Sequence, residues 1–247
     1  MTTVLVSSTQ AAALTVTGLP ADPPADLSVV ASGGVFGPEL LLCVAALVVA
    51  LLFRPWASLR ASSLHNPWLA ALVLLPWLWA VQRFLPADLP LQLSGACLAV
   101  LMFGWPLAIV TLLPVAAAGA WLAGVDVQHG VAMAFWNGVL PATLALGLGL
   151  MTRRWLPHHL FVYILARGFF VTALAISLAG LASMAWRPVP VGSDLETLAL
   201  SHALIGWGEA FATGMLTAIF VAFVPQWLLT YSDARYLPRD RPGPRTP

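Results

Sequence analysis

Four ionisable residues lie inside long apolar stretches of the sequence: Glu39, Arg167, His202 and Glu209. A charged group in a hydrocarbon environment is costly, so such a residue marks either a functional path or a polar contact that fixes helix packing. Glu39 and Arg167 lie near the ends of their stretches, where a long side chain can extend to a membrane surface. His202 and Glu209 lie further inside.

His202 and Glu209 are two helical turns apart, so they project from similar faces of one helix. We expect His202 near the outer surface and Glu209 deeper. An imidazole above a carboxylate suits a proton or metal path. It suits equally well two hydrogen-bond partners that join neighbouring helices, and the residues alone leave both interpretations open.

No sequence motif predicts an enzyme. The chain has no H-x-x-x-H, no C-x-x-C and no Walker-type loop, so no standard zinc or nucleotide site is indicated. No nucleophile stands with a base in any recognisable pattern. Cys43 and Cys97 both lie in apolar runs, and we expect them to be small hydrophobic residues inside helices.

The composition excludes a water-soluble globule. Of the 247 residues, 60% are hydrophobic and only 9% are charged, whereas a soluble domain carries about 25% charged residues. A disordered chain, a collagen and a disulfide scaffold are excluded as well. The 11 Trp, 20 Pro and 19 Gly residues are typical of a polytopic helical membrane protein. A net charge of +1 gives no indication of a nucleic-acid partner.

The apolar stretches predict the elements that must position these residues. Residues 1–34 form a mixed leader arm, without the basic start that a signal peptide needs. The apolar segments that follow are residues 37–53, 67–82, 91–124, 130–151, 160–186 and 199–229.

The stretch 91–124 decides the topology. As one helix it would be about 51 Å long, whereas a bilayer core is about 30 Å thick. A break at residues 104–106 gives two spans and a total of seven. With the break, eight flanking arginines fall on one side and only Arg83 and Arg187 on the other. The positive-inside rule then predicts the amino terminus outside and the carboxyl terminus in the cytoplasm.

Residues 200–214, LSHALIGWGEAFATG, resemble the HALIGxGEAxxTG signature of a known family. These are the membrane subunits of cobalt and nickel energy-coupling-factor transporters, of the CbiM/NikM type. Residues 95–106 look like the GGALAAxLLGPW segment of that family. Residues 130–141 look like its LGANxxNMxxxGP segment, with Asn137 on the second Asn.

The resemblance implies a seven-helix subunit that captures a divalent Co or Ni ion from the outer side. A transmembrane coupling subunit and cytoplasmic ATPases would move the ion inward. In the family, the ion is held by the amino terminus and His of an MHIPEG motif and by a His in a GHLLGG motif. Here the chain begins MTTVLVSS, Gln92 stands in place of the family His, and Ala134 stands on the first Asn of the GAN motif.

An amide is a poor substitute for imidazole as a ligand of Ni or Co, so three interpretations stay open. A new metal site near the outer mouth could use His129, His202, Gln92 and Asp126. The protein could carry another substrate. It could also be a divergent subunit that binds no metal itself.

We therefore expect an all-α, seven-transmembrane-helix bundle over residues 35–231 in a bacterial inner membrane, followed by a cytoplasmic tail, 232–247. The expected function is that of a permease or substrate-capture subunit for cobalt or nickel. Partner subunits would supply ATP hydrolysis, and no cofactor would be bound permanently. Glu209 and Asn137 are expected to organise the helix core along the path. The alternative is a non-transporting assembly or scaffold protein on the same fold.

Overall fold

The described part of the chain is helical. In the computed structural model, 87% of these residues lie in helices and none lies in a strand, which confirms the all-α class. The described residues are 37–59, 63–81, 93–157, 159–186 and 194–232. All of them belong to the unit Phe36–Pro247. The predicted leader arm and nearly all of the predicted tail lie outside the described residues.

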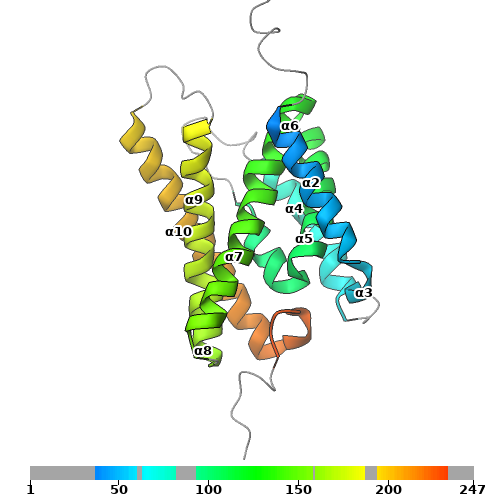
Figure 1. Ribbon diagram of the computed structural model, residues 1–247, viewed down its shortest axis with the longest axis vertical. Coiled ribbons are helices and arrows are strands. Elements are labelled where there is room, and N and C mark those ends of the chain that lie inside the picture. Colours follow the sequence, from blue (N-terminus) through cyan, green and yellow to red (C-terminus); the bar gives the residue numbers. More distant parts are fainter. Residues whose placement is uncertain (1–36, 60–62, 82–92, 158, 187–193, 233–247) are drawn as a thin grey trace, which may run out of the picture. The chain divides into compact units, whose positions relative to one another are not determined.

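Each apolar segment of the sequence contains a helix (Figure 1). Shorter α-helical, π-helical and 3₁₀ segments accompany the longer helices. In chain order the elements are α2 (Pro38–Leu52), α3 (Trp56–Leu59), α4 (His65–Ala80), α5 (Ala96–Ala123), α6 (Val127–Met133), η2 (Ala134–Val139), α7 (Leu140–Trp155), α8 (Leu160–Val162), η3 (Tyr163–Phe170), α9 (Val171–Trp186), α10 (Leu195–Phe223) and η4 (Pro225–Trp227).

α5 is broken at Gly104, as the sequence predicts. Gly104 has φ 74° and ψ 161°, a conformation that is essentially restricted to glycine. Two residues later, Pro106 has no backbone N–H and cannot bond the carbonyl of Met102. The backbone N–H of Leu229 donates to that carbonyl instead, at 2.9 Å. The residues after α10 therefore satisfy the end of the first arm of α5.

The two arms of α5 fold back on each other. On a straight helix, Gly95 and Gly119 would lie about 36 Å apart. Both approach the same short part of α4: a Cβ on Gly95 would lie 2.6 Å from Leu75, and one on Gly119 would lie 3.2 Å from Trp79. The first arm, from Ala96 to the break, is only about 12 Å long. It is a half-helix whose amino end lies inside the bundle.

The second half of the described unit consists of two continuous helical stretches and α10. α6, η2 and α7 join into Val127–Trp155, and α8, η3 and α9 join into Leu160–Trp186. Each contains a π-helical segment, a wider turn that occurs often at functional sites. α9 packs closely on α10, because glycines allow it: a Cβ on Gly206 would lie 2.3 Å from the Ser177 hydroxyl.

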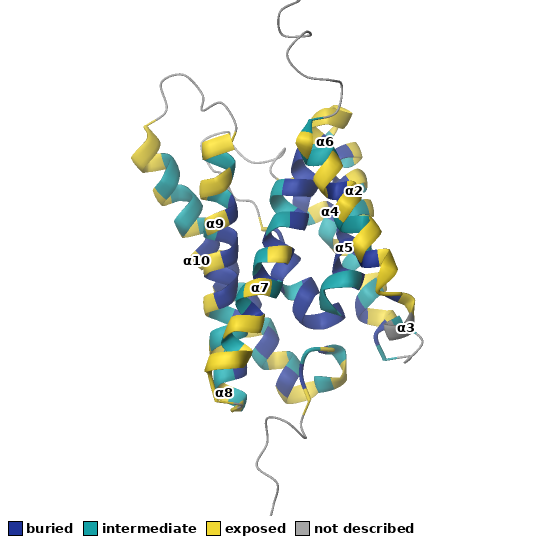
Figure 2. Cartoon of the chain, viewed as in Figure 1, coloured by how far each residue is buried: buried dark blue, intermediate teal, exposed yellow. Residues whose placement is uncertain are grey.

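Four helices are long and apolar enough to cross a membrane: Ala96–Ala123, Val127–Trp155, Leu160–Trp186 and Leu195–Phe223. α2 is apolar but shorter. Figure 2 shows exposed residues along the outward faces of the helices and buried ones between them. Many of the exposed residues are large and apolar, among them Leu41, Trp121 and Phe223. A lipid environment accounts for such surfaces, and the chain is a membrane protein.

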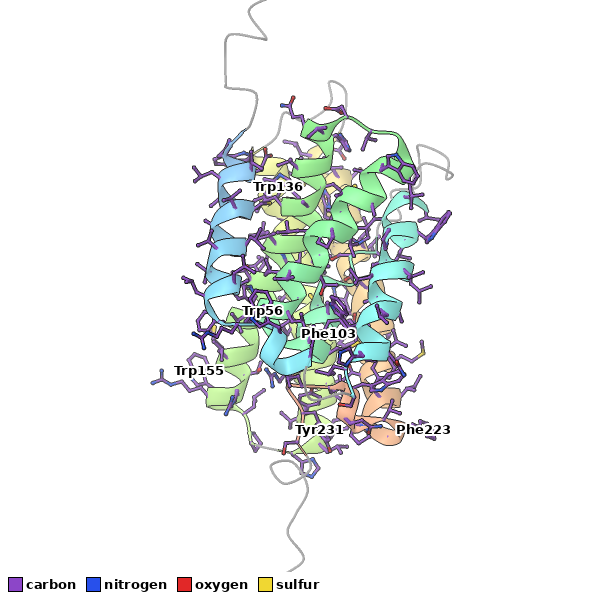
Figure 3. The ribbon with its side chains drawn as sticks, turned by 90° about the vertical axis from the view of Figure 1, so that its right-hand side faces the viewer. Trp56, Phe103, Trp136, Trp155, Phe223 and Tyr231 are labelled. Carbon is purple, nitrogen blue, oxygen red and sulfur yellow. The ribbon has the colours of Figure 1, made fainter. Side chains whose placement is uncertain are left out.

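The breaks and turns bring the basic ends of several helices together. α3, which follows Arg54, and α8, which follows Arg154, lie at the same end of the bundle, and α6 lies at the opposite end (Figure 1). In Figure 3, Trp155 and Tyr231 lie toward that same end. The end of α2, next to Arg54, and the end of α7, with Arg153 and Arg154, therefore lie at one end of the bundle.

Candidate functional site

Glu209 is the central residue of α10 and is only 2% exposed. Its carboxylate accepts two hydrogen bonds from the start of the half-helix. The backbone N–H of Ser94 donates to Oε2 at 2.8 Å, and that of Gly95 donates to Oε1 at 2.9 Å. No described cation pairs with it. The amino end of a helix carries a partial positive charge, so these two donors and the helix dipole stabilise the carboxylate.

Ser94 and Gly95 are suited to this contact. Gly95 has φ 67°, a left-handed conformation that a side chain would strain. A side chain there would also collide with Leu75. The Ser94 hydroxyl accepts from the backbone N–H of Ala96 at 3.0 Å, so it satisfies another free donor at the helix start.

The Ser94 hydroxyl also joins the half-helix to η2. It donates to the backbone carbonyl of Asn137. In an α-helix this carbonyl would accept from residue 141, but Pro141 has no N–H. That α-helical bond is therefore missing, and the carbonyl accepts from the Ser94 hydroxyl. The sequence N-x-x-x-P thus creates an acceptor within the bundle.

Trp79 completes the network from α4. Its indole Nε1 donates to the carbonyl of Ser94 at 2.7 Å, and its side chain is 2% exposed. The wide ring fits because η2 has a glycine opposite it: a Cβ on Gly138 would lie 3.2 Å from the ring. Four separate helical segments therefore meet at Ser94.

A cavity of about 180 Å³ adjoins this network. It lies between η2, the start of α7, α9 and α10, and Ser94 forms part of its wall. Its polar side chains are those of Ser94, Asn137, Ser183 and His202, and Trp136 lies beside them. Trp136 also donates through Nε1 to Glu39 at 3.0 Å, so the carboxylate of α2 is connected to the cavity wall.

His202 of α10 packs closely against Gly180 of α9. A Cβ on Gly180 would lie 2.6 to 2.8 Å from three atoms of His202, so only glycine leaves room for this ring position. Among the described residues, none forms a hydrogen bond with the His202 imidazole. His202 lines the polar cavity. Nitrogen of a neutral imidazole is a good ligand for a transition metal and a good proton acceptor.

The structure separates the predicted metal ligands into two places. Asp126 is the N-cap of α6, and its Oδ2 accepts from the backbone N–H of His129 at 3.3 Å. Both residues are exposed. Asp126 lines a different, mostly apolar cavity of about 370 Å³ between α2, α5 and α6. His202 lines the polar cavity described above.

In the described part of the chain, no three His, Cys, Asp or Glu residues form a group that could hold a metal ion. Gln92 lies outside the described residues. The four-residue set of His129, His202, Gln92 and Asp126 therefore stays a prediction. The other two predicted residues, Glu209 and Asn137, both contact the amino end of the half-helix through Ser94 or Gly95.

Sequence analysis did not identify Ser94, Trp79 or Gly180. A signal exists for the first of these, because Ser followed by Gly at the start of an apolar run is typical of a helix amino terminus. For Trp79 and Gly180 the sequence carries no local signal, since their roles depend on which helices become neighbours.

In comparisons with known proteins, no family model, no curated protein and no solved structure matches the chain.

Proposed function

We propose that the protein is a membrane permease or substrate-capture subunit of an energy-coupling-factor type transporter for cobalt or nickel. The chain would cross a bacterial inner membrane seven times, with its amino terminus outside and its carboxyl terminus in the cytoplasm. A coupling subunit and ATPase subunits would be its partners. The proposal rests first on the HALIG and GEA residues of 200–214, which include His202 and Glu209.

The single structural observation that favours transport is the polar cavity beside a broken helix. Irregular backbone at membrane depth is tolerated where it lines a cavity or is buried in protein. Transporters place substrate sites at such discontinuous helices. Here the break leaves the amino end of a half-helix against Glu209, and His202 and Asn137 line the space next to it.

One imidazole with an amide and two hydroxyl groups is a weak donor set for Co or Ni. The cavity therefore fits a place along the path of the ion better than its tightest binding point. His129 and Asp126, with Gln92, remain candidates for capture at the outer mouth.

Uptake of radioactive Ni and Co tests the proposal, in a strain that lacks the gene and carries it again on a plasmid. We expect uptake to be restored by the wild type and reduced at least about tenfold by Gly180→Ala, because the added methyl displaces His202 from its position. Gly208→Ala is the matched control, since a Cβ there meets no atom within 4 Å. Metal titration of purified His129→Ala and His202→Ala variants tests the outer site. His159→Ala serves as control, because His159 precedes α8, at the opposite end of the bundle from α6 (Figure 1).

A non-transporting assembly or scaffold protein is the second candidate, because Gln92 stands in place of a His that holds the ion in the family that the chain resembles. Absence of Ni and Co uptake, together with unchanged metal affinity in both histidine variants, would favour it. Genes next to this one discriminate further: an ATPase and a coupling subunit favour transport, and metalloenzyme genes favour assembly.

A further inference from the structure

Arg167 lies in η3 with an unsatisfied donor. Its Nε is buried, and among the described residues it is the one buried side-chain nitrogen or oxygen without a hydrogen-bond partner. The nearest compensating group is the ring of Tyr163, whose centre lies 5.6 Å from Cζ. No described carboxylate lies within ion-pair distance of this guanidinium. An arginine in an apolar helix without an anion is costly, so an anionic ligand is expected there.

Arg167 shares a small cavity with a second arginine. Arg153 and Thr152 of α7 line it, together with Leu156, Pro157 and Tyr163. The cavity measures about 10 Å³, which is enough for one water-sized group. Gly149 makes room for the guanidinium, since a Cβ there would lie 3.4 Å from Nη2. One oxygen atom of an anion could thus enter while the rest of the anion stays at the mouth.

The depth of the site matches the edge of a bilayer. Arg167 lies about 10 Å along the stretch that begins at Leu160, and the whole stretch is about 40 Å long. A hydrocarbon core of about 30 Å centred on this stretch would end about 5 Å from Leu160, so the long arginine side chain can reach headgroup level. Exposed Trp155 and Phe161 are also located at this end.

We propose that this cavity binds a phosphate group, with one phosphate oxygen beside Arg167 and the others paired with Arg153. Guanidinium groups bind phosphate with strong, charge-assisted hydrogen bonds. The phosphate comes from a phospholipid headgroup or from free phosphate. The inference is independent of the transport proposal, because the cavity beside Arg167 shares no residue with the polar cavity that His202 lines.

The test uses adjacent arginines of α7. Arg153 and Arg154 are both exposed and carry the same charge, but only Arg153 lines the cavity. Purified full-length protein in detergent is titrated with dioleoylphosphatidylglycerol, and binding is followed by native mass spectrometry and by thermal unfolding. We expect Arg167→Gln and Arg153→Gln each to weaken binding at least about tenfold, and Arg154→Gln to change it less than about twofold.

A second arm replaces the lipid with inorganic phosphate at constant ionic strength. Saturable stabilisation of the wild type by phosphate, lost in Arg153→Gln, identifies free phosphate as the ligand. Stabilisation by the lipid alone identifies the headgroup. If Arg167→Gln does not fold, the comparison of Arg153→Gln with Arg154→Gln decides. Equal weakening in these two variants, or no saturable binding to the wild type in either arm, overturns the proposal.

Discussion

At the scale of single residues, the buried carboxylate of Glu209 is stabilised by backbone and not by a cation. Two N–H groups at the start of a helix point to its two oxygens. Removal of the charge would leave a helix terminus in the bundle with a weaker acceptor. In water such donors could bind solvent, but inside an apolar bundle they cannot. Glu209 is therefore needed for the position of the half-helix, and Ser94 at the start of that half-helix forms part of the cavity wall.

Glu209→Gln should destabilise the protein by about 2 kcal/mol, because the amide has one acceptor oxygen and its NH₂ faces a donor. Thermal unfolding in detergent measures this. Glu196→Gln is the control on the same helix: Glu196 is exposed, and its replacement should change stability by less than about 0.5 kcal/mol. Equal stability of Glu209→Gln and the wild type would contradict the assigned contact.

Asp194, the N-cap of α10, gives a pH-dependent prediction outside the membrane. Hydrogen bonds from the Thr197 hydroxyl and from the backbone N–H groups of Thr197 and Glu196 hold the pKa of Asp194 below its ordinary value of 3.8. A lowered pKa means that the cap stabilises the folded state above 3.8 and loses this contribution as the pH falls through the lower folded value. The NMR shift of the Thr197 amide should therefore titrate with a midpoint below 3.8. A titration midpoint at or above 3.8 would exclude the cap. The same titration of the Thr197 amide in the Asp194→Asn variant would exclude it as well.

Part of this residue-level arrangement could be predicted from sequence. An acid in the middle of an apolar helix indicates a buried polar contact, and Glu209 has one. The identity of its partner could not be predicted, because the donors are backbone groups of Ser94 and Gly95, more than a hundred residues away. His202 was expected near Glu209 on one face, and it lines the cavity whose wall includes Ser94.

At the scale of elements, the break in α5 follows from two residues. Gly104 allows the conformation, and Pro106 removes a donor, so the apolar run cannot continue as one helix. Residues after α10 then donate hydrogen bonds to the carbonyls of Leu101 and Met102, just before the break. Besides the Leu229 bond, the Thr230 hydroxyl donates to the carbonyl of Leu101 at 2.8 Å, and Leu228 is buried.

Gly104→Ala should destabilise the protein by about 1 to 3 kcal/mol, because alanine is strained at this φ and ψ. It should also contact Leu229, whose Cδ2 would lie 3.3 Å from the new methyl. Unfolding in detergent provides the measurement. Gly147→Ala in α7 is the matched control, since no atom lies within 4 Å of its added Cβ. We expect Gly147→Ala to be neutral or slightly stabilising. The same small effect in both variants would mean that residue 104 is not at a break.

The positions of the longer helices and the break at residues 104–106 are what the apolar pattern and the Gly and Pro residues indicate. The length of the first arm is different from the expectation. The sequence predicts a span from residue 91, but the helix begins at Ala96, because Ser94 and Gly95 form its start. The helix expected within 199–229 begins earlier, at Leu195, and ends earlier, at Phe223, because Pro225 begins a 3₁₀ turn. Both differences result from polar backbone contacts that an apolar pattern does not record.

At the scale of the whole molecule, a fold-back at Gly104 determines on which side of the membrane every later element lies. It places the end of α7 and the residues after α10 at one end of the bundle, with α6 at the other (Figures 1 and 3). The proposed seven crossings, with a cytoplasmic tail and an outward-facing mouth, depend on this reversal.

Side-specific thiol labelling in intact cells tests the reversal most directly. The background is a variant with Cys43 and Cys97 replaced by alanine, since both are buried and free. Single cysteines replace the exposed residues Asn66, Gln128 and Arg153. The account predicts that a membrane-impermeant reagent labels position 128 from outside and labels positions 66 and 153 only after the cells are opened. Labelling of positions 66 and 153 from opposite sides of the membrane would contradict it, because an unbroken α5 would separate them by an odd number of crossings.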